Sequence, residues 1–488
     1  MRSSSGELTP HEDVVASIAE HTLGCGATIG VGGGRFSPGA FGDGCLALSA
    51  RGSSEKYSRI SALLCDCLLR GEPSLARVRV QAAKLLNAVP RSARDGGACA
   101  AALLLSRTRA AAGSNARAAA FPCQQVVLTR VLAACESEPQ RVLDDLTALR
   151  SSLLSSPSRI LLHVAASLTS LSPPPAASPL DVWRASLLPA LSVRSAQPAS
   201  APLLALLPGR VAWSSSPSAA AASPYGWAAA VGNPAVDSGF LSSRAPGPGR
   251  FDHPDSAPLI VACEALTMLE GPLWKGLRGT GLAYSYSLHP SFEDASVVFG
   301  LYKSTAVAAA WAEAARIVRR AAAAGDGCGG GGSGGGGAPA LDATSLETAV
   351  SSAIFAVVNG ERTPSAAGRA SLLACLRGTG PGASRRLVAA LRSVTLADAA
   401  RVLRAYVVPL FDSQTCAAAM CVNADKAGDA AAALAAAGLG GMRVTSLEEA
   451  FGTAASVVCV AKKGDDAADG AGCACFRCLK PGGPFSLR

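Results

Sequence analysis

Histidine is scarce in this sequence, with five residues among 488. A zinc hydrolase commonly binds its metal through two histidines on one helix, spaced as H-E-x-x-H or H-x-x-E-H. None of the five has another histidine at that spacing: His11, His21, His163, His253 and His289. We therefore predict that these 488 residues supply no metal ligand, no catalytic residue and no bound cofactor.

Aromatic residues make up 5% of the chain, and no apolar run reaches the roughly 18 residues of a membrane helix. The net charge of +9 comes from arginines spread singly along the chain rather than from a basic stripe interleaved with aromatic residues. We expect neither nucleic acid nor a membrane as a partner. The first residues lack the apolar core of a signal peptide, so the cytoplasm is the default location. A mitochondrial or plastid location is the alternative if an upstream region carries a targeting signal.

Other catalytic motifs are absent or incomplete. No P-loop occurs, and G-x-S-x-G matches only at residues 331–335, without the strand and helix that this motif requires. Cys473, Cys475 and Cys478 form C-x-C-x-x-C, but a zinc site needs a second pair of ligands. We interpret them as cysteines of a tail without a metal site.

The apolar pattern of the first part of the chain predicts strands followed by helices. Residues 24–50 alternate small and β-branched residues with glycines, which indicates two short strands joined by a loop. A buried strand is also expected within residues 158–167 (SRILLHVAAS). Apolar residues spaced three and four apart predict helices over Ser58–Arg70, Leu75–Ala88, Gly97–Ala112, Cys123–Glu136 and Arg141–Leu154.

The second part repeats this order. GWAAAVGNPAV, which follows Tyr225, predicts a strand, and a long helix is expected over Leu259–Arg278. AYSYSLHP and ASVVFGLYKS predict a strand pair, and CAAAMCVN and ASVVCVAKK are expected to close the sheet. Further helices are predicted over Thr305–Ala324, Ser345–Val358, Ser365–Leu376, Ser384–Ser393 and Leu396–Val407.

These patterns predict an α+β fold of two similar domains, each an antiparallel or mixed sheet with helices packed on one face. The first domain is expected over residues 1–191 and the second over 225–463, joined by a Ser/Pro/Ala-rich linker over 192–224. A glycine-rich insertion at 325–340 has almost no side chains to bury, so we predict that it is flexible. The same is expected of the cysteine-containing tail, residues 464–488.

One segment combines groups that could bind a peptide: EGPLWKGLRGTGLAY, Glu270–Tyr284. A helix that ends at Arg278, a Gly-Thr-Gly turn and a strand that starts at Tyr284 would place a guanidinium and a phenol at the two ends of one turn. The guanidinium offers a fork of donors for carbonyl or carboxylate oxygens, and the phenol adds a donor. The chemistry alone leaves a second interpretation open, in which Arg278 pairs with a nearby carboxylate and Tyr284 belongs to the strand core.

The segment LEGPLWKGLRGTGLAYSYSL…VVFGLYKS resembles the fourth domain of pitrilysin/insulinase-type zinc peptidases, particularly presequence-protease-like and related uncharacterised eukaryotic members. Flanking blocks extend the resemblance, among them GNPAVDSGFLSSRAPGPGRFDHPDSAPLIVACEAL before it and FAVVNGERTPSAAGRASLLACLRGTGP after it. Upstream, HEDVVASIAEHTLGCGATIGVGGGRFSPGAF and KLLNAVPRSARDG resemble the third domain. The similarity covers most of residues 8–463.

This resemblance implies a C-terminal half of a two-half enzyme that encloses peptides in a chamber. In the family the zinc ligands and the catalytic glutamate lie in the first domain, and an Arg and a Tyr of the fourth domain hold the substrate. Arg278 and Tyr284 match that pair in R-x-x-x-x-x-Y spacing, which favours a role in binding unstructured peptides. Zinc is expected only in the N-terminal half, which these residues do not include.

Three functions remain open on this basis. The chain is a substrate-gripping half that is inactive alone, or it is completed by an N-terminal half in cis or in trans. Alternatively, it is a structural subunit of a larger complex that has lost peptidase function.

Overall fold

A computed structural model describes residues 9–108, 114–154, 160–167, 171, 179–187, 223–323 and 341–450. Nearly all of the predicted linker, the glycine-rich insertion, the predicted strand ASVVCVAKK and the cysteine-containing tail lie outside these described residues. Within the described part of the chain, no helix has both the length and the hydropathy needed to cross a membrane.

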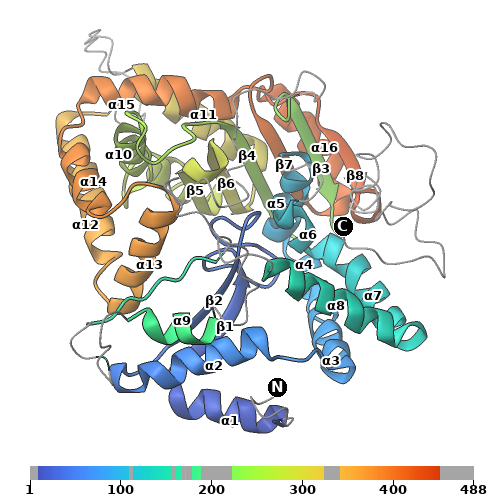
Figure 1. Cartoon of the computed structure of the whole chain (residues 1–488). Helices are drawn as coiled ribbons and strands as arrows, with labels where there is room; N and C mark the ends of the chain where they lie inside the picture. Colours follow the sequence, from blue (N-terminus) through green and yellow to red (C-terminus); the bar gives the residue numbers. More distant parts are fainter. Residues whose placement is uncertain are drawn as a thin grey trace, which may run out of the picture.

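The second part of the chain forms a mixed six-stranded sheet in the order β5-β6-β4-β7-β3-β8 (Figure 1). β3 pairs in parallel with β7 and β8, and all other neighbours are antiparallel. β5 and β8 are therefore its two edge strands. The strands span β3 Trp227–Gly232, β4 Gly239–Pro246, β5 Ala283–Ser291, β6 Ser296–Ser304, β7 Ala417–Val422 and β8 Arg443–Ser446.

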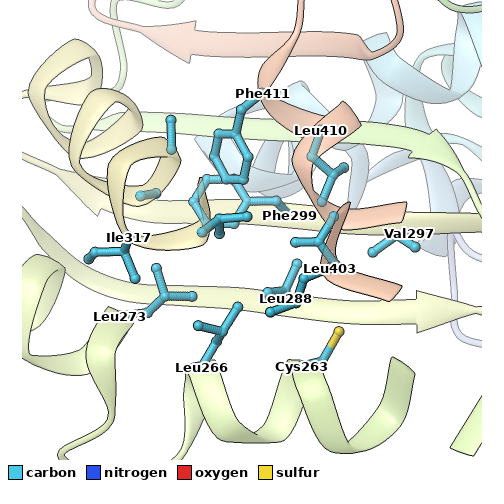
Figure 2. Packing of buried hydrophobic residues seen from close by; sticks show 14 of the residues in the cluster. Cys263, Leu266, Leu273, Leu288, Val297, Phe299, Ile317, Leu403, Leu410 and Phe411 are labelled. Atoms are coloured by element: carbon cyan, nitrogen blue, oxygen red, sulfur yellow. The ribbon is translucent and has the colours of Figure 1, made fainter. Parts of the chain in front are cut away.

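Helices of the second part cover one face of this sheet. Their apolar sides and the facing strand residues form the largest buried cluster, in which Phe299 and Phe411 lie 5.0 Å apart between ring centres (Figure 2). Asp342 caps one of these helices by accepting a hydrogen bond from the Ser345 N–H. The helices of the second part are α10 Ser256–Thr267, α11 Val307–Ala323, α12 Ala343–Asn359, α13 Pro364–Leu376, α14 Ala383–Arg392, α15 Leu396–Val402 and α16 Ala427–Ala436. Of these, α10, α11 and α16 contact the sheet, and α12, α14 and α15 pack against α10.

The first part contains more helix than sheet. β1 (Gly24–Ile29) and β2 (Leu46–Arg51) form a two-stranded antiparallel ribbon in which no residue is fully buried. Leu46 and Leu48 expose 45% and 39% of their surface. The helices are α1 His11–His21, α2 Tyr57–Leu69, α3 Leu75–Leu86, α4 Val89–Ala93, α5 Gly96–Thr108, α6 Asn115–Ala119, α7 Phe121–Ser137, α8 Pro139–Leu153 and α9 Asp181–Leu187.

Helix α5 of the first part packs against the other face of the six-stranded sheet, over β4, β7 and β3. Cys99 of α5 and Cys421 of β7 are both fully buried in this contact. Asn233, next to β3, donates a hydrogen bond to the Ala93 carbonyl at 2.8 Å and so ties the two parts together. The two parts of the chain thus share a hydrophobic core.

The predicted α+β class is confirmed, as are the strand pairs at residues 24–50 and 283–304. Two predicted elements are wrong. Residues 160–167 form no strand and pair with no strand of the described residues, and none of them is fully buried. The helix expected over Leu259–Arg278 ends at Thr267, because Glu270 takes a positive φ of 59° and Pro272 follows.

Candidate functional site

Arg278 is held by a short, wide helical turn rather than by an ordinary α-helix. Residues Trp274–Arg278 form one π-helical turn, a conformation that is often found at functional sites. Leu273 and Leu277 are fully buried and anchor the turn in the core. Gly276 lets it approach α11, since a Cβ there would lie 2.5 Å from Ile317 Cδ1. The turn therefore fixes the backbone of Arg278 and leaves its side chain exposed.

Tyr284 stands at the beginning of β5, opposite a local irregularity in β6. The register pairs Ala283 with Ser304 and Ser285 with Tyr302, so Tyr284 faces Lys303. Lys303 has a φ of 52°, and the pairing of β6 with β4 shifts register close by. Such bulges bend a strand and re-aim side chains near functional sites. The phenol of Tyr284 consequently leaves the core, and the residue is 64% exposed.

The structure brings Arg278 and Tyr284 together. The guanidinium carbon lies 5.4 Å from the centre of the Tyr284 ring, within the range of a cation–π contact. Within the described residues, Arg278 makes no ion pair and Tyr284 makes no hydrogen bond through its hydroxyl. The interpretation of Tyr284 as a strand-core residue is wrong, because the side chain is mostly in solvent. Both side chains present free donors on the same side of one turn.

Tyr286, two residues further along β5, is a supporting residue of this site. Its hydroxyl donates a hydrogen bond to the Thr267 carbonyl at 3.3 Å, which ties β5 to the end of α10. Burial raises the pKa of Tyr286 to about 12, while the positive charge of Arg278 acts in the opposite direction. Tyr286 therefore stays protonated at neutral pH and serves as a donor to the backbone.

The opposite face of β5 carries polar side chains that sequence reasoning did not assign to a site. His289 lies two residues beyond Ser287 on this face, and Arg244 of β4 forms an ion pair of 3.3 Å with Asp294. The imidazole is partly exposed, yet the surrounding protein lowers the pKa of His289, and the charge of Arg244 lowers it further. In the sequence, the polar residues Ser285, Ser287 and His289 at every second position were the signal that one face of this strand is polar.

No three His, Cys, Asp or Glu side chains gather into a metal-binding group within the described part of the chain. The described residues therefore do not fit a zinc ion, and no chemical step can be assigned to a metal among them. Cys473, Cys475 and Cys478 lie outside the described residues.

No family model matches the sequence. An uncharacterised protein of Saccharomyces cerevisiae is 36% identical over 75 residues, which are 15% of this chain and 7% of the yeast protein. The chain thus spans a small fraction of the length of the curated relative that it matches.

Several solved structures of peptidases are similar to part of this chain. An inactive peptidase domain from Bordetella parapertussis is 17% identical, with 38% of this chain and 91% of that chain covered and a TM-score of 0.30. A protease from Helicobacter pylori is 14% identical, with 41% and 47% covered and a TM-score of 0.32. Pitrilysin is 12% identical, with 47% and 22% covered and a TM-score of 0.33.

Proposed function

We propose that this chain is the C-terminal, substrate-gripping half of a pitrilysin/insulinase-type zinc metallopeptidase of the presequence-protease-like kind, and that it does not cleave peptides alone. The observation that carries the proposal is the contact between Arg278 and Tyr284 at the start of β5. The two residues match the spacing of the family's substrate-binding pair, and both are exposed. The ligand class is an unstructured peptide, bound through its backbone.

The chemistry of the pair suits a peptide carbonyl. The guanidinium of Arg278 donates charge-assisted hydrogen bonds in a planar fork, and the Tyr284 hydroxyl donates a neutral one. The cation–π contact holds the Arg278 guanidinium over the Tyr284 ring, so the donor groups of the two side chains lie close together. Donors placed at a carbonyl oxygen favour the charge that develops there during hydrolysis. In this chain alone they bind the peptide and orient it.

The test measures binding of a labelled unstructured peptide to the purified chain by fluorescence anisotropy. We expect binding without hydrolysis, and no effect of a zinc chelator. Arg278→Ala and Tyr284→Phe each should weaken binding about five- to a hundredfold, which corresponds to roughly 1 to 3 kcal/mol. Matched controls are Arg443→Ala on β8 and Tyr302→Phe on β6, which remove the same groups elsewhere on the sheet. Zinc-dependent cleavage by the pure chain would refute the proposal.

A second candidate is half of an active peptidase that an N-terminal half completes, in cis or in trans. The ribbon of β1 and β2 favours it, because an isolated two-stranded sheet is marginally stable in water. Its exposed Leu46 and Leu48 offer apolar surface to further strands. The test is a search for an in-frame upstream segment or a separate chain that encodes H-x-x-E-H. Mixing that half with this chain should then produce zinc-dependent peptidase activity, which neither half has alone.

A further inference from the structure

The strand that begins with Tyr284 lies at the edge of its sheet. β5 pairs with β6 on one side and, within the described residues, with no strand on the other (Figure 1). An edge strand presents a row of unpaired N–H and C=O groups, which can receive another strand. The site of Arg278 and Tyr284 therefore stands at one end of an open backbone edge.

The register of the sheet shows which groups point outward. Gly247 donates a hydrogen bond from its N–H to the Ala295 carbonyl, one position beyond the paired residues of β4 and β6. Bonded and non-bonded pairs alternate in an antiparallel ladder, so up to the irregularity at Lys303 the odd-numbered residues of β6 bond toward β4 and the even-numbered ones toward β5. The partners of those even-numbered residues are the odd-numbered residues of β5. Tyr286 and Leu288 consequently point their N–H and C=O groups to the open edge.

Two features delimit this edge. Pro290 occupies the next outward position of β5, where a missing N–H costs nothing because no strand of the described part of the chain pairs with that side. At the other end the exposed phenol of Tyr284 and the guanidinium of Arg278 follow directly. No described residue donates a backbone or side-chain hydrogen bond to the outer edge of β5. The open segment therefore runs from Tyr284 to His289, about 16 to 20 Å at the usual rise of a strand.

We propose that the peptide held by Arg278 and Tyr284 pairs with β5 as an additional strand, by exchanging backbone hydrogen bonds with Tyr286 and Leu288. This inference rests on the proposed function and adds the geometry of the bound ligand. The bound segment is extended and about five or six residues long. Because recognition is by main-chain groups, the site accepts many sequences but rejects helical or folded segments. One carbonyl of the segment reaches the donors of Arg278 and Tyr284.

The proposal predicts a period of two in the peptide. In a strand, alternate amide groups point to the same side, so only every second peptide N–H faces β5. The probe is a blocked, unstructured octapeptide, synthesised without modification and with a single N-methyl amide at each successive position. N-methylation of an amide that faces β5 should weaken binding about tenfold, and methylation of its neighbours should have little effect.

The outcomes separate this inference from the proposed function. If the unmodified octapeptide binds and the N-methyl series is flat, the peptide does not pair with β5 and the inference is refuted, while peptide binding stands. If the octapeptide does not bind at all, the proposed function and the inference fall together. Hydrogen exchange gives an independent readout, because amide protection should increase in residues 283–291 on binding. β8, the other edge strand, is the internal control and should not change.

Discussion

Gly96, at the start of α5, lies directly against the ring of Phe240 in β4. A Cβ at position 96 would stand 2.2 Å from Phe240 Cδ2, closer than two non-bonded carbon atoms can approach. The contact joins the first part of the chain to the sheet of the second part. Position 96 requires glycine because the Phe240 ring leaves no room for a Cβ atom, and not because of the backbone conformation.

Gly96→Ala should therefore destabilise the protein by about 1 to 3 kcal/mol, the usual cost of overpacking a core. Urea denaturation, monitored by circular dichroism, measures the change in the free energy of unfolding. Gly428→Ala in α16 is the matched control, because no atom lies within 4 Å of a Cβ at that position. That control should leave stability unchanged or raise it slightly, since alanine favours helix. Equal effects of the two substitutions would contradict the packing argument.

Arg278→Lys should weaken peptide binding although it keeps the positive charge. An ammonium cannot reproduce the planar fork of donors, and it stacks less well on the Tyr284 ring. We expect a loss of about five- to thirtyfold, or about 1 to 2 kcal/mol. Stability should change little, since Arg278 is exposed. If all substitutions at Arg278 and Tyr284 left peptide binding intact, a structural subunit would be the better description of the chain.

Asp255 should make stability depend on pH. A hydrogen bond from Arg401 is the main cause that lowers the pKa of Asp255, assisted by the Tyr406 hydroxyl at 2.8 Å. The folded state therefore favours the carboxylate, and this contribution is present at neutral pH and lost as the pH falls through the folded pKa. Arg401→Gln should cost about 1 kcal/mol at pH 7, because Arg401 is half exposed and the pair is screened.

The difference between wild type and Arg401→Gln should begin to shrink below about pH 4, where Asp255 of the unfolded chain becomes protonated, and it is lost as the pH falls through the lower pKa of the folded state. Urea denaturation at pH 7 and at pH 3 measures it. Arg443→Gln on β8 provides an exposed control arginine. A cost of equal size at both pH values would show that Arg401 acts through packing instead of through its charge.

The cysteines should differ sharply in reactivity. Cys25 is exposed, whereas Cys263 and Cys421 are buried. Burial raises the pKa of Cys263 to about 12, so its thiolate is scarce at neutral pH. Iodoacetamide should label Cys25 within minutes in the native protein, and the two buried thiols only in denaturant. Mass spectrometry of peptides reads the pattern, and rapid native labelling of Cys421 would show that the contact of α5 with the sheet opens.

Leu48→Ser should leave the isolated chain nearly as stable as before, within about 0.5 kcal/mol, because this residue of the ribbon is exposed. The same change should reduce assembly with a zinc-bearing N-terminal half. Val80→Ser on α3 is the control, since it removes an exposed apolar side chain elsewhere. Assembly that tolerates both changes equally would argue against the ribbon as the docking surface.

Helices with a clear apolar period were predictable from the sequence, and the structure places most of them within a few residues of the expected bounds. β4 was missed because its central residues Ser242, Ser243 and Arg244 show no alternation. Arg244 is mostly buried and forms an ion pair with Asp294, which lies on the turn before β6. Such a partner is set by the fold and leaves no local signal.

The candidate site was predictable in part. The spacing of Arg278 and Tyr284 placed them at the two ends of one turn. Their contact depends on the π-helical turn and on the irregular backbone at Lys303, which lies on another strand. The position of β5 at the sheet edge is equally non-local, because strand order is decided by long-range pairing.

The packing of α5 on β7 also has a consequence for synthesis on the ribosome. α5 belongs to the first quarter of the chain, but the strand that buries its apolar side is made near the end. At about 5 to 20 residues per second, the delay between the two is on the order of tens of seconds. During that time Cys99 and its apolar neighbours lack the part of their partner surface that β7 supplies. A nascent chain halted before β7 should therefore be captured by chaperones, and a thiol reagent should label it at Cys99. Once synthesis is complete, neither the capture nor the labelling should occur.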